Sequence, residues 1–208
     1  MAKTVVYGNP ASTFVRAVRM ALEEKGVPYT VEPSDPNTPE QFGRHPFGKV
    51  PAFESDGVRL FESRAICRYI DENFAGPALQ PADKTARARM DQWISATSDY
   101  LYTNGIRRMV LPYVRAMRSK SAPDQAAIDQ AKPDVKANLM VFDRALGESR
   151  YLAGETVSMA DLFLLPIVFY LANFVPEKEE LMADRPNLRR WLGDMSKRPS
   201  FAKTMPPI

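Results

Sequence analysis

The fold of this chain is decided by two neighbouring stretches, Gly48-Lys49-Val50-Pro51-Ala52-Phe53 and Leu60-Phe61-Glu62-Ser63-Arg64-Ala65-Ile66. Pro51 cannot donate to a strand ladder, so its place before an apolar pair predicts a turn that enters an edge strand. Cis peptide bonds occur almost only before proline, and we predict one between Val50 and Pro51. The pair Asp56-Gly57 supplies a tight turn, so the stretches on either side should form an antiparallel hairpin.

The hairpin runs directly into a predicted helix. Ser63 is a good first residue for a helix whose apolar face carries Ile66, Ile70 and Phe74. The backbone amides of a helix start have no partner inside the helix and favour an anion. A carboxylate is therefore expected to dock at Ser63.

The residues before the hairpin complete a small α/β domain. Residues 4–7 are rich in strand formers, and Val15, Val18 and Leu22 then recur at helical spacing as far as Gly26. A second strand is predicted over 29–32, and three prolines make 33–39 a loop. The predicted order is βαβ, loop, ββα.

After a turn-rich stretch over 75–81, every remaining element is predicted to be helical. A long amphipathic helix begins at Lys84, and Gly105 and Pro112 are expected to bend or break it. A further helix covers 138–147, and Pro133 leaves its start open. Because only helices are predicted after the turn-rich stretch, we expect an all-α domain to follow the α/β domain.

Two helix starts near the end of the chain have clear signatures. Ser158-Met159-Ala160-Asp161 has the form of a capping box with Asp in place of Glu, and an apolar run follows it. Pro186 suits the first turn of a last helix, which carries Leu188, Trp191 and Leu192 and which Pro199 would end.

Composition excludes several classes of function. The 28 basic and 25 acidic residues give a net charge of +3 and are interspersed, so nucleic-acid binding is not indicated. The single cysteine, Cys67, excludes an intrachain disulfide and multi-cysteine metal sites, which suits a cytoplasmic protein. It lies beside Ile66 and Ile70, where a buried, inert thiol is expected. The longest apolar stretch, 162–172, is shorter than the ~20 residues of a membrane helix.

Three segments together resemble one family. Pro46-Phe47-Gly48-Lys49-Val50-Pro51-Ala52-Phe53 and Phe61-Glu62-Ser63-Arg64-Ala65-Ile66 look like the glutathione-binding half of a cytosolic glutathione transferase. Asn9-Pro10-Ala11-Ser12-Thr13-Phe14-Val15-Arg16-Ala17 resembles the serine-containing first loop of the phi-like members. The resemblance implies a thioredoxin-like glutathione-binding domain at 1–76, a linker at 77–82 and an all-helical domain at 83–208.

Ser12 is the predicted catalytic residue. A hydroxyl donor near a helix N-terminus stabilises a charged sulfur and so lowers the pKa of a thiol from ~8.5. Without the resemblance, a plain helix cap would be the better interpretation of Ser12. Tyr7 is the first alternative, because other branches of the family use a tyrosine near the end of strand one, and the adjacent Thr13 is the second.

The resemblance also implies how reduced glutathione, the co-substrate, is held. Ser63 takes the γ-glutamyl carboxylate, Glu62 faces the ammonium group, and Val50 before Pro51 offers its backbone to the cysteinyl part like an added strand. Lys49 faces the carboxylate end. A helix cap alone is the structural alternative for Glu62 and Ser63. No metal and no permanently bound cofactor is expected.

The chain departs from the phi pattern at the glycyl end of this site. Residues 33–44 lack the His-Lys pair that such enzymes use on the glycyl carboxylate, and His45 replaces the usual Asn before Pro46. Arg44, His45 and Lys49 are the candidates to replace that pair. His45 could equally be a structural loop residue satisfied by backbone groups.

The electrophile site is expected between the two domains. Its candidate lining residues share a place on the long helical stretch: Tyr100, Tyr102, Met109, Tyr113 and Met117. A methionine and aromatic series at helical spacing is more often core packing, and that alternative stays open.

The predicted function is conjugation of the glutathione thiolate to electrophilic hydrophobic molecules. By resemblance the protein acts in detoxification as a cytoplasmic homodimer with no nucleic-acid or membrane partner. Three alternatives stay open: a non-catalytic carrier, a transferase-like interaction domain, and a glutathione-dependent peroxidase or dehalogenase. The retained Ser12 favours an enzyme over a carrier.

Overall fold

The computed structural model describes residues 4–206, which divide into two compact units. One unit holds the residues up to Gln80 together with those from Ser196 onward, and the other is Pro81–Met195. The all-helical domain was expected to continue to the end of the chain. Instead, the described residues after Met195 group with the α/β unit, because they pack on a helix of that unit.

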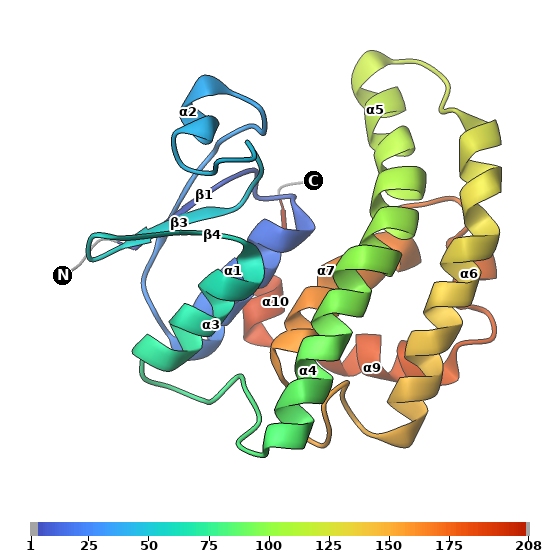
Figure 1. Ribbon diagram of the computed structural model, residues 1–208. Helices are drawn as coiled ribbons and strands as arrows, with labels where there is room; N and C mark the ends of the chain where they lie inside the picture. The colour runs from blue at the N-terminus through green and yellow to red at the C-terminus, as the bar shows by residue number, and fades with distance from the viewer. Residues whose placement is uncertain (1–3, 207–208) are drawn as a thin grey trace. The chain divides into compact units, whose positions relative to one another are not determined.

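The first unit is built on a four-stranded mixed sheet (Figure 1). Its strand order is β2-β1-β3-β4, with β1 parallel to β2 and antiparallel to β3, and with β3 antiparallel to β4. Helices α1 and α3 pack against each other on one side of these strands. The elements of this unit are β1 (Val5–Tyr7), α1 (Thr13–Lys25), β2 (Thr30–Glu32), α2 (Pro39–Phe42), β3 (Ala52–Ser55), β4 (Val58–Phe61), α3 (Ser63–Asn73) and α10 (Pro199–Lys203).

The predicted hairpin is confirmed, with one correction. Strands β3 and β4 pair from Ala52 opposite Phe61 to Ser55 opposite Val58, and Asp56 and Gly57 between them both have positive φ. However, β3 is an interior strand and not an edge strand, because it also pairs with β1. Proline is tolerated there because Pro51 stands one residue before the ladder begins and its missing N–H is not needed.

The loop predicted over 33–39 is followed by α2, a short helix that the sequence did not predict. Thr38 caps α2, since its hydroxyl accepts from the backbone N–H of Gln41 at 3.2 Å. Pro39 occupies the first turn, where proline is favoured because its missing N–H is not required.

The C-terminal segment, residues 196–206, lies against α1. Arg198 forms a bidentate pair with Glu24 at 2.8 and 2.6 Å, and Ser200 donates to the same carboxylate. The guanidinium of the fully buried Arg16 lies 5.0 Å from the centre of the Phe201 ring. α10 was missing from the prediction, which took the helix before Pro199 as the last one. The helix before Pro199 does end ahead of it, at Ser196, but Pro199 also opens α10, where proline is compatible with the first turn.

The second unit is helical throughout. Its elements are α4 (Lys84–Ala96), η1 (Thr97–Val110), α5 (Leu111–Ser119), α6 (Gln125–Glu148), α7 (Met159–Asn173), α8 (Lys178–Met182) and α9 (Pro186–Ser196). No helix within residues 4–206 is long and apolar enough to cross a membrane. The predicted α/β domain and helical domain are both confirmed.

The long helix is not broken at Gly105 or Pro112, the two residues that were expected to bend or break it. α4, η1 and α5 follow one another without a gap, and the wider π-type hydrogen-bond pattern of η1 includes Gly105. Pro112 lies in the first turn of α5, where it is tolerated. Likewise Pro133 lies inside α6 and does not mark its start, which is instead Asp124 capping the N–H of Ala127 at 3.1 Å.

The predicted capping box at Ser158 is confirmed. Its two polar side chains, those of Ser158 and Asp161, are buried within the helical unit. The fully buried carboxylate of Asp161 accepts from the Ser158 backbone N–H at 2.9 Å, from Trp191 Nε1 at 2.9 Å and from the Leu152 N–H at 3.1 Å. Burial raises the pKa of Asp161, while these donors act against that rise. The box thereby joins α7 to α9, the helix that carries Trp191.

Candidate functional site

Ser12 lies at the N-terminus of α1, directly after the loop that follows β1. It is the N-cap residue, yet its hydroxyl makes no capping hydrogen bond to the helix. The loop is instead held by Asn9, whose side-chain oxygen and carbonyl accept from the N–H groups of Ala11 and Ser12, both at 2.9 Å. Because Ser12 is only half-buried, its hydroxyl is available to a ligand.

The two alternative donors, Tyr7 and Thr13, differ from Ser12 in their surroundings. Thr13 is 4% exposed, and its hydroxyl oxygen is sealed from solvent without a hydrogen-bond partner among the described residues. Tyr7 ends β1, before the loop that leads to α1, and the guanidinium of Arg44 lies 4.3 Å from the centre of its ring. Of the three hydroxyls, that of Ser12 is thus the one placed both at the helix end and within reach of solvent.

Glu62 and Ser63 stand where β4 passes into α3. The structure places Glu62 at the N-cap and Ser63 at the first helical position, so the helix begins at Ser63 as predicted. Neither side chain is recorded as capping the helix. Glu62 has φ +67°, an uncommon conformation for a residue other than glycine and one found often at functional sites. The first-turn amides of a helix have no partner inside that helix, so this end of α3 favours an anion.

Lys49, Val50 and Pro51 lead into β3. The Val50–Pro51 bond is cis, as predicted. The carbonyl of Lys49 accepts from Nε2 of Gln41 at 2.6 Å, while its ammonium-bearing side chain is exposed. No backbone hydrogen bond of Val50 is recorded within residues 4–206, which leaves its N–H and C=O for a ligand strand.

His45 is almost fully buried in the loop after α2. Its Nδ1 accepts from the backbone N–H of Phe47 at 3.2 Å, so the ring proton sits on Nε2. Burial lowers the pKa of His45, although the nearby Glu62 carboxylate, 3.9 Å from Nε2, acts to raise it. The ring is therefore neutral near pH 7, and the backbone hydrogen bond to its Nδ1 agrees with the structural alternative.

The candidate electrophile residues do not share one environment. Met109 is 0% exposed and packs in the core of the helical unit, whereas Tyr100 and Met117 are 62% and 67% exposed. Tyr102 is half-buried, with the Arg107 guanidinium 5.6 Å from its ring centre. Full burial assigns Met109 to packing, which was the alternative interpretation of the series.

Tyr113 has a partner that the sequence did not predict. Its hydroxyl donates to Oε1 of Glu177 at 2.6 Å, and Gln125 approaches the same oxygen at 3.5 Å. Burial, together with the Glu177 carboxylate, raises the pKa of Tyr113 to about 12. The Tyr113 hydroxyl is thus committed to Glu177, and only its ring face is open to an apolar ligand.

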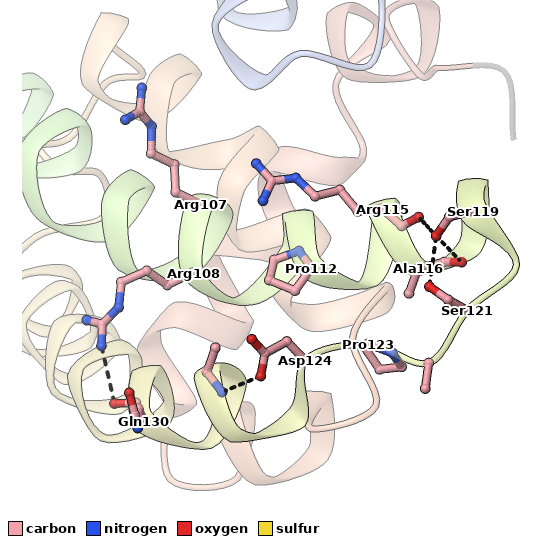
Figure 2. Close-up of a pocket in the computed structure, with 12 residues that line it drawn as sticks. Arg107, Arg108, Pro112, Arg115, Ala116, Ser119, Ser121, Pro123, Asp124 and Gln130 are labelled. Atoms are coloured by element: carbon pink, nitrogen blue, oxygen red, sulfur yellow. Dashed lines mark hydrogen bonds between the residues drawn. The ribbon is translucent and has the colours of Figure 1, made fainter.

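A separate cavity of about 390 Å³ lies in the helical unit (Figure 2). Arg108 on its wall is already neutralised by Asp134 at 2.6 Å and reaches the carbonyl of Gln130 at 3.4 Å. The walls come from η1, α5 and the start of α6: Arg107, Arg108, Pro112, Arg115, Ala116, Ser119, Ser121, Ala122, Pro123, Asp124, Ala127 and Gln130. None of the predicted glutathione or electrophile residues is among them. The described residues also contain no cluster of three or more His, Cys, Asp or Glu side chains suited to a metal ion.

Two further residues of the first unit, Cys67 and Gln41, are fully buried. Cys67 is fully buried, and burial raises the pKa of its thiol far above the usual range, so the predicted inert thiol is confirmed. Gln41 was not predicted, although it is fully buried and holds the Lys49 carbonyl. A lone glutamine in a proline-rich loop gives no periodic signal that could have identified it.

Comparison with known proteins finds relatives that align with both units of this chain. Residues 6–78 match the family described as Glutathione S-transferase, N-terminal domain, and residues 106–199 match Glutathione S-transferase, C-terminal domain. Glutathione S-transferase 3 of Zea mays is 33% identical, and the alignment spans 100% of this chain and 96% of that protein.

Solved structures agree. Glutathione transferase F2 from Populus trichocarpa is 35% identical, with a TM-score of 0.86 over 97% of this chain and 96% of that one. A theta class glutathione S-transferase from Xanthomonas axonopodis pv. citri, solved with glutathione bound, is 28% identical, with a TM-score of 0.86 over 100% and 99% of the two chains. With both domains matched and a relative more than 30% identical along its whole length, this chain belongs to the glutathione S-transferase family.

Proposed function

We propose that Ser12 carries the glutathione transferase reaction of this protein. The observation that supports this proposal most is that Ser12 occupies the N-cap of α1, yet its hydroxyl makes no capping hydrogen bond to the helix. That hydroxyl can donate a hydrogen bond to the sulfur of glutathione, at the helix end whose dipole favours negative charge. A thiol pKa lowered by ~2 units needs only ~2.7 kcal/mol, which a hydrogen bond to a charged group plus a helix-end contribution can supply.

In the proposed reaction, the glutathione thiol first loses its proton to solvent. The thiolate then attacks the electrophilic carbon, a carbon–sulfur bond forms, and the leaving group departs with its electron pair. In an addition to an activated alkene, the neighbouring carbon takes up a proton from solvent instead. Ser12 keeps its own proton throughout, because it stabilises the sulfur and acts neither as an acid nor as a covalent nucleophile.

The remaining proposed contacts involve residues at the end of β4 and before β3. Ser63 and the amides of α3 take the γ-glutamyl carboxylate, and the exposed carboxylate of Glu62 faces the ammonium group. Val50, beside Pro51, pairs its free backbone groups with the cysteinyl part. Lys49 faces the glycyl carboxylate.

The acceptor is proposed to be a hydrophobic electrophile. Among the helical residues, the ring of Tyr113 and the exposed Tyr100 and Met117 offer apolar surface, and Tyr102 is partly open. A cytoplasmic homodimer acting in detoxification is the accompanying proposal and follows from the family assignment. Gel filtration of the purified protein measures the assembly.

The substitution Ser12→Ala tests the central proposal. It should raise the thiol pKa of bound glutathione, which ultraviolet titration of the thiolate reports, and should lower kcat at neutral pH by a factor of ~10–100. Glutathione affinity should change little, and the rate should recover partly at high pH, where solution supplies thiolate.

The matched variant is Tyr7→Phe, which removes the first alternative hydroxyl. If Tyr7→Phe abolishes thiolate formation while Ser12→Ala leaves it unchanged, the serine assignment is wrong. If neither matters in a protein that binds glutathione, the non-catalytic carrier is the better description. Thermal unfolding of both variants is the control, because a smaller fraction of folded protein would also lower the measured rate.

A further inference from the structure

Gln41 of α2 is a buried polar residue with every hydrogen-bonding group of its side chain engaged. It is 0% exposed, and its backbone N–H is capped by Thr38. Its side-chain Nε2 donates to the carbonyl of Lys49 at 2.6 Å, and its Oε1 accepts from the hydroxyl of Ser34 at 2.7 Å. Because a carbonyl oxygen can only accept, the Lys49 contact fixes which way the amide is turned.

These contacts hold the chain immediately before β3. The carbonyl of Gly48 accepts from the backbone N–H of Asn37 at 2.8 Å, and the next carbonyl, that of Lys49, accepts from Gln41. The consecutive carbonyls of Gly48 and Lys49 are thus both held by hydrogen bonds from residues within α2 or just before it. The following residue is Val50, whose backbone groups have no recorded hydrogen bond within residues 4–206.

Packing ties the same two segments together. Gly48 has φ +60°, and a Cβ built on it would lie 2.7 Å from the ring of Phe42 in α2. Only glycine allows so close an approach at that conformation. The segment before β3 and α2 therefore form one packed unit, with the Gln41 amide as its buried polar link.

We infer that Gln41 is a positioning residue for the glutathione site. It holds the Lys49 carbonyl so that Val50 presents its N–H and C=O in the direction a bound cysteinyl backbone requires. This inference rests on the proposed function, since it assigns Gln41 a role only through Val50. Gln41 itself contacts no substrate, because it is fully buried.

The test compares two substitutions that each remove one part of the network. Gln41→Met keeps the length and burial of the side chain but leaves the Lys49 carbonyl without its donor. Ser34→Ala removes only the partner of Oε1 and leaves the Lys49 contact intact. Calorimetry should show glutathione affinity reduced about tenfold, or about 1.4 kcal/mol, in Gln41→Met and changed less than twofold in Ser34→Ala.

A third variant gives a signature that loss of packing would not produce. In Gln41→Glu, an ionised carboxylate would repel the Lys49 carbonyl, whereas the protonated carboxyl can donate to it. Burial raises the pKa of such a carboxyl. The ratio of mutant to wild-type glutathione affinity should therefore rise severalfold between pH 8 and pH 6. Taking the ratio removes the pH dependence of glutathione itself.

The outcomes separate this inference from the proposed function. If the unmodified protein does not bind glutathione, or if its Val50 amide signal in NMR does not move on binding, the proposed site is wrong. If it binds and the Val50 signal moves, equal affinity in Gln41→Met overturns the role of Gln41. Should Gln41→Met fail to fold, a pH-independent affinity ratio in Gln41→Glu overturns it instead.

Discussion

At the scale of single residues, Ser63 offers a clean test of the γ-glutamyl contact. Its side chain is 8% exposed and is not used to cap α3, because Glu62 occupies the cap position. Ser63→Ala should therefore leave the thermal stability of the protein within about 1 kcal/mol of the original. It should weaken glutathione binding by a factor of ~10, because a hydrogen bond to a charged group is lost. Calorimetry measures the affinity.

Ser119, a serine of the helical unit, serves as the control. Ser119→Ala removes a hydroxyl that donates to the carbonyl of Arg115 in α5, and it should not change glutathione affinity. Unchanged affinity in Ser63→Ala would place the γ-glutamyl carboxylate elsewhere. Loss of folded Ser63→Ala protein would instead show that the hydroxyl has a structural role.

Residues whose role depends on local chain geometry could be predicted, and those whose role depends on distant contacts could not. The cis bond at Pro51 follows from the residue type and its neighbours. Gln41 and Glu177 act through partners on other segments, Lys49 and Tyr113, which no spacing in the sequence brings together. The Ser12 assignment stays a prediction until thiolate formation is measured.

At the scale of elements, Gly105 shows why the long helix is not broken where a bend or break was expected. A Cβ on Gly105 would lie 2.9 Å from Cδ1 of Leu171, a fully buried residue of α7. Glycine at this position marks a close approach of two helices and not an interruption. Helix propensity alone would make Gly105→Ala stabilising by ~1 kcal/mol.

We therefore expect Gly105→Ala to destabilise the protein by about 1 kcal/mol, since overpacking of a closed core outweighs the gain in propensity. The matched control is Gly193→Ala in α9, where a new Cβ meets nothing within 4 Å and should stabilise by ~0.5–1 kcal/mol. Urea denaturation measures both. The same sign for the two substitutions would contradict the packing argument.

The short elements were the ones that the sequence did not predict. α2, α8 and α10 have four or five residues each, too few for a helical period to become visible. Long amphipathic segments such as α1 were predicted closely, and that helix ends at Gly26 as predicted, with Gly26 in a left-handed conformation. The start of α6 was not predicted, because Pro133, which lies inside this helix, is of a residue type that often marks a helix boundary.

At the scale of the whole molecule, the Glu24–Arg198 pair fixes a distant part of the chain to α1. Burial works against ionisation of Glu24, but the hydrogen bonds from Arg198 and Ser200 and the Arg198 charge together lower the pKa of Glu24. A carboxyl with a lowered folded pKa stabilises the fold above its unfolded pKa of about 4.3, and that contribution is lost as the pH falls through the folded pKa.

Glu24→Gln should accordingly lower the free energy of unfolding at pH 7 by about 1–2 kcal/mol. The difference from the unmodified protein should shrink as the pH falls below about 4, where both side chains are uncharged. Denaturation curves collected from pH 7 to pH 3 measure this difference. A difference that stays constant over this range would show that the carboxylate charge contributes nothing.

The first unit is made of residues that come before and after the helical unit in the sequence. Because a chain is synthesised from its N-terminus, the ribosome makes the whole helical unit before it makes the last residues of the first unit. A ribosome that has made Gln80 must add 196 − 80 = 116 more residues before Ser196 exists. At ~5–20 residues per second this takes about 6–23 s. During that interval the nascent chain holds the four strands and α1 while the partners of Arg16 and Glu24 are still untranslated. The helical unit, although second in sequence, is thus the first to have all of its own residues.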